Sequence, residues 1–110
     1  MTEAEKYFAE LTAEISDVMP GKMFGALCMK TANGKSAAMF WKDNIVVKLT
    51  GASLNNAMNL DGTKIFEPME GRPMKEWVQI PFDYKKQWKH YAQLSVESVK
   101  ILKKKVAKKK

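Results

Sequence analysis

The stretch that decides the fold is residues 22–49, KMFGALCMKTANGKSAAMFWKDNIVVKL. Two polar pairs, Asn33-Gly34 and Asp43-Asn44, divide it into short runs rich in apolar residues. Asn-Gly favours a tight hairpin turn because both of its residues tolerate a positive φ angle. The pattern therefore predicts a meander of three antiparallel strands. The predicted strands span 22–30, 35–42 and 45–49.

The segment before the meander has the pattern of a surface helix over residues 2–18. Its apolar side chains recur at steps of three and four, which places them on one face of a helix. Thr2 and Glu5 match a capping box at its start, and Pro20-Gly21 predicts its end. The apolar positions are Tyr7 or Phe8, Leu11, Ile15 and Val18.

The segment after the meander predicts a short helix, two short strands and a long final helix. The short helix begins at Thr50 or Ser53 and ends near Asp61-Gly62. Asp83 is the predicted N-cap of the final helix. The two strands are 64–66 and 77–80, and the apolar positions of the final helix are Trp88, Ala92, Ser95, Val99, Leu102 and Val106.

These elements predict an α+β fold of two layers. The order is helix, three strands, helix, two strands, helix, so the sheet has about five strands. Hairpins and the absence of strand–helix–strand spacing make the sheet antiparallel, with the helices mostly on one face. We expect one domain over residues 1–106, followed by a lysine-rich tail over 107–110.

Several predicted strands are apolar on both faces. Val46, for example, points opposite to its neighbours Ile45 and Val47. Because a two-layer domain covers one face of its sheet, the second face needs the C-terminal helix, a second copy of the chain or a ligand. Homodimerisation is therefore one prediction. The alternatives are a helix that wraps around the sheet, or a few exposed aromatic side chains.

Length and composition limit the class of protein. The chain has 110 residues with an apolar fraction of 45%, typical of one globular domain. No apolar run approaches the ~20 residues that cross a bilayer, so we expect no membrane insertion. The acidic N-terminus does not resemble a secretory signal, and the single Cys28 forms no internal disulfide. These features predict a cytoplasmic protein.

The net charge of +7 arises from the C-terminal part of the chain. Residues 1–18 contain five acids and one lysine, whereas residues 84–110 contain ten lysines and one glutamate. Such a basic segment suits the phosphates of a nucleic acid, bound without sequence preference because arginine is absent from it. The alternatives are lysines that favour the helix dipole or a tail that aids solubility. The candidate contacts are Lys85, Lys86, Lys89, Lys100, Lys103, Lys104, Lys105, Lys108, Lys109 and Lys110.

Three segments resemble the N-terminal domain of the TfoX (Sxy) family of bacterial competence regulators and its stand-alone relatives. They are Met23-Phe24-Gly25 at the start of the first predicted strand, Asn44–Leu49 as the third, and the loop Glu67–Met74. The resemblance covers roughly residues 5–100 and implies an α+β domain from a bacterium. The regulators carry a second domain, so a role in DNA uptake is not expected here. The motif residues, which are structural, are Met23, Phe24, Gly25, Gly71, Pro73 and Pro81.

The residue types needed for catalysis are scarce. Cys28 and His90 are the only cysteine and histidine, and a buried thiol and an exposed helical imidazole explain them better than a catalytic pair does. No spacing offers three metal ligands, and no glycine-rich phosphate loop is present. The sequence predicts no enzymatic activity and no cofactor. The only arginine, Arg72, could bind an anion together with Lys75 and Trp77, although such an arginine more often binds local carbonyls or an acid.

The function predicted from these residues is that of a non-enzymatic binding or regulatory module. The partner is a second copy of the chain, an unidentified protein or a nucleic acid held by the lysine-rich C-terminus. A weaker alternative is a small-ligand or enzymatic pocket near Arg72 and Trp77.

Overall fold

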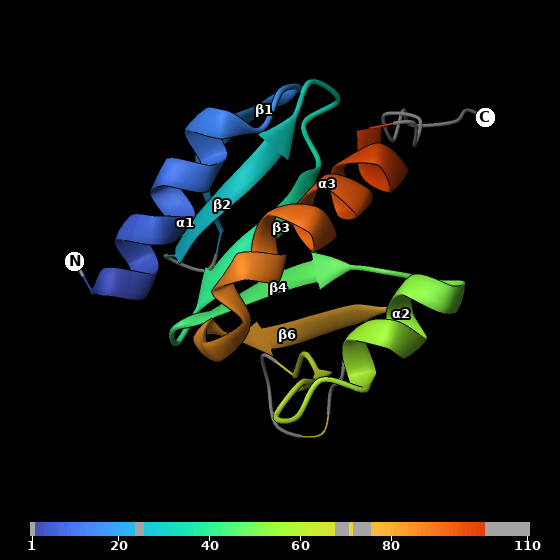
Figure 1. Ribbon diagram of the computed structural model, residues 1–110. Coiled ribbons are helices and arrows are strands. Elements are labelled where there is room, and N and C mark those ends of the chain that lie inside the picture. Colours follow the sequence, from blue (N-terminus) through green and yellow to red (C-terminus); the bar gives the residue numbers. More distant parts are fainter. Residues whose placement is uncertain (1, 24–25, 68–70, 72–75, 101–110) are drawn as a thin grey trace.

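A computed structural model describes residues 2–23, 26–67, 71 and 76–100. These residues form three α-helices and one antiparallel sheet of six strands. Helices α1 (Glu3–Glu14) and α3 (Lys85–Lys100) lie side by side across one face of the sheet (Figure 1). Helix α2 (Gly51–Met58) follows the fourth strand. The predicted α+β class, with helices at the N-terminus, in the middle and at the C-terminal end, is confirmed.

The strands follow the order β1-β2-β3-β4-β6-β5 across the sheet. Strands β1 to β4 are consecutive neighbours, and β6 then pairs with β4 and places the two-residue β5 at the far edge. The strand bounds are β1 Val18–Met23, β2 Ala26–Thr31, β3 Ser36–Trp41, β4 Asn44–Lys48, β5 Lys64–Ile65 and β6 Trp77–Pro81.

The prediction of a single strand over 22–30 was wrong, because two strands occupy this region. Helix α1 ends at Glu14, the chain turns at Asp17 with a φ angle of 71°, and Val18 then begins β1 instead of extending the helix. Pro20-Gly21 lies inside β1 and does not stop the chain there. Proline is compatible with β1 because it is an edge strand, where one side of the backbone needs no partner.

The extra strand also changes the order of elements, which is helix, four strands, helix, two strands, helix. Met23 ends β1 and does not open a strand, while Phe24 and Gly25 lie outside the described residues. The segment predicted as the third strand is the fourth, β4.

The predicted local signals around the meander are present. Gly34 has a φ angle of 82° in the turn between β2 and β3, as the Asn-Gly pair predicted. The Thr2 hydroxyl accepts a hydrogen bond from the Glu5 amide at 3.1 Å and caps α1. The turn between β3 and β4 consists of Lys42 and Asp43, with φ angles of 47° and 65°. The sequence had predicted Asp43-Asn44 as the turn, one residue later.

The start of the last helix also differs from the prediction. Residues Phe82–Tyr84 form a short 3₁₀ helix that leads into α3, and Asp83 lies within it rather than capping α3. Trp88, Ala92, Ser95 and Val99 are buried, as their spacing predicted. Leu102 and Val106, and with them the end of the predicted domain and its tail, lie outside the described residues.

The apolar side chains form two clusters, one for each face of the sheet. The larger cluster lies between the sheet and the helices, and includes Phe8 of α1, Ile45 of β4 and Trp88 of α3. The smaller one contains Cys28, Met39, Val46 and Phe66 and has no residue from a described helix. The prediction of strands that are apolar on both faces is therefore confirmed.

Candidate binding surfaces

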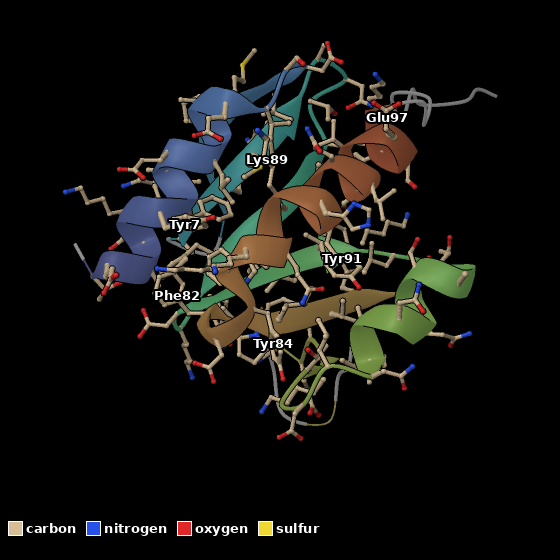
Figure 2. The ribbon with its side chains drawn as sticks, viewed as in Figure 1. Tyr7, Phe82, Tyr84, Lys89, Tyr91 and Glu97 are labelled. Carbon is tan, nitrogen blue, oxygen red and sulfur yellow. The ribbon has the colours of Figure 1, made fainter. Side chains whose placement is uncertain are left out.

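Helix α3 carries the described lysines of the predicted nucleic-acid surface, and most of them face acids. Lys85 lies 3.9 Å from Glu3 and Lys89 lies 3.3 Å from Glu14, both on α1. Lys89 projects from α3 on the side of α1 (Figure 2). The acidic N-terminal segment and the basic C-terminal segment therefore meet along the line where these two helices lie side by side, which we call the helix seam.

Lys100 has two carboxylate partners at the end of α3. Its ammonium lies 3.0 Å from Asp17 and 3.2 Å from Glu97. The hydrogen bond to Asp17 raises the pKa of Lys100 above its usual value of 10.5, and the hydrogen bond to Glu97 raises it further by a smaller amount. Among the described residues, Lys86 has no carboxylate within 4.0 Å and is exposed. The remaining predicted lysines, from Lys103 onward, lie outside the described residues.

Trp88, which lies among these lysines in the sequence, belongs to the packing of the seam together with Tyr7 and Phe82. Tyr7 of α1 contacts Phe82 and Trp88 with ring centroids 5.9 Å apart in both pairs, and Figure 2 places Tyr7 and Phe82 together. The Tyr7 hydroxyl donates to the Lys85 carbonyl at 3.1 Å, and the Trp88 indole donates to the Pro81 carbonyl at 3.0 Å. With these partners, Trp88 is fully buried. This aromatic group stabilises the contact between two helices, and within it Trp88 has no exposed surface for base stacking.

The opposite face of the sheet, which we call the helix-free face, has a different composition. It is turned away from the viewer in Figure 1. Strand alternation and register place on it the residues that point away from the larger cluster. They form rows that cross the strands: Cys28, Met39, Val46, Gln79 and Lys64 in one row, Lys48 and Trp77 in a second, and Trp41 in a third. Lys30 also lies on this face, because its aliphatic stem crosses Gly21, the partner of Cys28.

The centre of the helix-free face is buried within the single chain. Cys28, Met39, Val46 and Phe66 are each at most 1% exposed. Phe66 follows β5, yet its ring meets Trp41 of β3 edge-on at 5.4 Å, so it reaches across the face. Among the described residues, the large apolar side chains that are exposed are Met19 and Met58. The homodimer prediction assumed an exposed apolar sheet face, but the described centre of the helix-free face is buried within the single chain. Homodimerisation stays a prediction.

The lysines of the helix-free face lack the acidic partners that α3 has. No described strand contains an Asp or Glu, while Lys30, Lys48 and Lys64 lie in strands. None of these three has a carboxylate within 4.0 Å among the described residues, and neither does Lys42 in the turn after Trp41. Trp41 and Trp77, both half-buried, lie among them. Sequence reasoning missed this set, although the place of each lysine in an otherwise apolar strand was visible.

A hollow of about 180 Å³ opens at one end of this face. Strands β3, β5 and β6, the turn after β3 and the residue Glu67 contribute to it. Its lining residues are Trp41, Lys42, Lys64, Ile65, Glu67 and Gln79. The Lys42 ammonium lies 5.6 Å from the centroid of the Trp41 ring, within the range of a cation–π contact. Aromatic, cationic, amide and carboxylate groups thus meet in one small space.

The other predicted site residues divide between described and undescribed segments. Arg72, Lys75 and Pro73 lie outside the described residues, whereas Trp77 begins β6 on the helix-free face and Pro81 ends that strand. Gly71 has a φ angle of 80°, and its amide donates to the Glu67 carboxylate at 2.7 Å. The positive φ angle explains a glycine at this position.

The two residues considered for catalysis are not brought together. Cys28 is buried in the smaller cluster, on the far side of the sheet from α3, and His90 is exposed on α3. Over the described part of the chain, no three His, Cys, Asp or Glu side chains gather as metal ligands would. Within the same residues, none of the helices has the length and apolar character needed to cross a membrane.

We compared the chain with models of protein families, with curated proteins and with solved structures, and none of the three comparisons gave a match. The resemblance to the TfoX N-terminal domain therefore stays a prediction.

Proposed function

We propose that the protein is a non-enzymatic binding module whose contact surface is the helix-free face, and that its partner is a nucleic acid bound mainly through phosphates. One observation carries the proposal. Lys30, Lys48 and Lys64 have no carboxylate partner among the described residues, whereas Lys85, Lys89 and Lys100 do. Lysines without partners leave a positive field that attracts an anion, and lysines paired with acids contribute little to it.

The chemistry of the face favours binding with little sequence preference. Lysine is a flexible point charge, so it neutralises phosphates but does not form the paired contacts by which arginine reads guanine. The half-buried Trp41 and Trp77 add apolar surface beside the cations. A regulatory role of the kind that the TfoX resemblance implies agrees with such a surface.

Two double variants with the same change of charge test the proposal. Lys30→Gln/Lys48→Gln removes two cations from the helix-free face, and Lys85→Gln/Lys89→Gln removes two from the helix seam. The probe is a labelled single-stranded oligonucleotide of about 20 nucleotides, which is longer than the binding site of one small domain. Fluorescence anisotropy gives its affinity as a function of salt concentration.

We expect the first variant to reduce the slope of log affinity against log salt by about 0.7 for each phosphate of a single strand that it no longer neutralises. The second variant should keep the wild-type slope. Equal slopes for Lys30→Gln/Lys48→Gln and wild type would reject the helix-free face as the contact surface.

The lysine-rich C-terminus is the second candidate surface, and a third variant examines it. This variant neutralises the last six lysines: Lys103, Lys104, Lys105, Lys108, Lys109 and Lys110. If this change alone removes the dependence on salt, the tail is the contact and the proposal for the sheet is wrong. If the slope survives, the sheet remains the contact surface.

A further inference from the structure

We infer that the hollow beside Trp41 binds one unpaired nucleotide of a single-stranded nucleic acid, with the base against the indole ring and a phosphate at Lys42 and Lys64. The inference rests on the proposed function and adds to it a defined site and a preference for single strands. The hollow of about 180 Å³ is small compared with the roughly 300–1,000 Å³ of pockets for drug-sized ligands. Its size therefore suits one base and not a large ligand.

The side chains around the hollow match the parts of a nucleotide. The half-buried Trp41 offers an aromatic ring, and bases stack on aromatic rings whatever their sequence. The Lys42 ammonium lies over this ring, 5.6 Å from its centroid, so a base that stacks on that side displaces the flexible lysine side chain. The displaced ammonium stays close enough to contact the phosphate of the same nucleotide. Lys64 approaches the hollow from β5, so two exposed cations from different elements border the same space.

The polar groups of the hollow suit the edge of a base better than a free anion. The Gln79 side chain has no hydrogen-bond partner among the described residues, so both its donor and its acceptor are available. The Glu67 carboxylate accepts from the Gly71 amide with Oε2, and its other oxygen can accept from an exocyclic amino group, as carboxylates do with cytosine. Inorganic phosphate has no ring to stack on Trp41 and no amino group to donate to Glu67, which argues against a simple phosphate site.

The hollow is held in place by contacts of the neighbouring turn. Lys42 and Asp43 both adopt positive φ angles, which cost energy for residues other than glycine and persist only where surrounding contacts hold them. The Asn44 amide donates to the carbonyls of Trp41 and Lys42 at 3.2 and 3.1 Å. The Thr2 hydroxyl donates to Asp43 at 3.0 Å. On the other side, the Phe66 ring packs against Trp41. The indole and the Lys42 backbone are thus ordered before a ligand arrives.

The preference for single strands follows from access to the base. In a duplex the bases are stacked and paired, and a base must leave the stack before a side-chain ring can contact its face. A single strand presents unpaired bases without that cost.

The test measures how well three competitors displace a labelled oligocytidine single strand of about 20 nucleotides. The competitors are the same strand without the label, a duplex of the same length and inorganic phosphate. Wild type should prefer the single strand to the duplex at least tenfold, and phosphate should compete only through ionic strength. Trp41→Leu should weaken single-strand binding by about 5- to 150-fold, which corresponds to 1–3 kcal/mol for one stacked base. Tyr84→Leu is the matched control, because Tyr84 is a half-buried aromatic residue that packs against the larger cluster and not on the helix-free face. It should retain the affinity and the preference for the single strand.

Lys42→Gln is a second variant that does not depend on the packing of Trp41, because Lys42 is exposed. It should lower the single-strand affinity without changing the melting temperature. Equal affinity for single strand and duplex, no effect of Trp41→Leu and Lys42→Gln, or equal losses for Trp41→Leu and Tyr84→Leu would overturn the nucleotide site. The proposed function would survive such a result if Lys30→Gln/Lys48→Gln still weakened binding, and it would fail separately if that variant had no effect.

Discussion

The helix seam and the helix-free face use the same residue types in opposite ways. At the seam, the Lys89 ammonium lies 3.3 Å from Glu14, and Trp88 is fully buried between aromatic neighbours. On the helix-free face, Lys48 and Lys64 have no carboxylate within 4.0 Å among the described residues, and Trp77 is half-buried. The comparison teaches that the surroundings of a lysine or tryptophan, and not its frequency in a segment, determine whether it can contact a ligand.

The difference between the two regions has a simple electrostatic origin. Helix α1 contains four glutamates, and two of them, Glu3 and Glu14, lie beside lysines of α3. The described strands contain no acid at all. An exposed ion pair contributes only about 0–1 kcal/mol to stability. Its larger effect is to cancel the positive field of α3, which leaves the sheet as the more attractive described surface for an anion.

The largest expected effect in this comparison is on the stability of the seam. Trp88→Ala removes the most buried large aromatic residue of α3, together with its hydrogen bond to the Pro81 carbonyl. Replacing a buried Trp by Ala typically costs about 3–5 kcal/mol because apolar packing disappears and a cavity is left behind. Urea denaturation of the purified protein measures this change in the free energy of unfolding.

Trp77→Ala is the corresponding change on the helix-free face, and it should cost clearly less because Trp77 is only half-buried. An equal loss for the two variants would break the distinction, since the helix-free face would then be as important to the core as the seam.

Ser95 provides an intermediate effect on the same helix. Its hydroxyl donates to the Ala37 carbonyl and accepts from the Lys48 amide at 2.9 Å. Ser95→Ala would leave both backbone groups without this partner in a buried region, at a cost of about 1–3 kcal/mol. Ser98→Ala is the control, because Ser98 is exposed on the same helix and should leave the melting curve unchanged. A wild-type stability for Ser95→Ala would mean that water replaces the hydroxyl.

Local signals in the sequence predicted much of the fold. The Asn33-Gly34 turn, the Thr2 cap and the buried positions from Trp88 to Val99 all depend on neighbours within a few residues, so a pattern can reveal them. The first strand was missed because Pro20-Gly21 is a typical helix stop. That these residues lie in an edge strand depends on the order of strands in the sheet, which no local pattern determines.

The candidate surface was harder to predict because its decisive facts are tertiary. The sequence indicated that α3 is basic, but Lys89 and its partner Glu14 are far apart along the chain and meet only when the two helices pack. Ser95 was expected to be part of an apolar stripe. Its hydroxyl instead joins Ala37 of β3 to Lys48 of β4, just beyond the pair Ala38 and Val47 where the β3–β4 ladder ends. The hollow beside Trp41 likewise combines residues from three strands and two connecting segments.

The smallest expected effect concerns Lys100, which joins the end of α3 to Asp17. Because its pKa is raised in the folded protein, Lys100 contributes stability that is fully present below its unfolded pKa near 10.5 and is lost as pH rises through the higher folded value. Lys100→Gln should therefore lower the melting temperature slightly at neutral pH, and its difference from wild type should shrink above pH 10.5. Lys86→Gln, which removes an exposed lysine without a described carboxylate partner, should show no such convergence. Thermal melts across alkaline pH measure both variants, and a constant difference for Lys100→Gln would mean that its ion pairs do not contribute in solution.

Lys100→Gln should also bind oligonucleotides as wild type does, because a lysine held by Asp17 and Glu97 adds little to the field that a phosphate encounters.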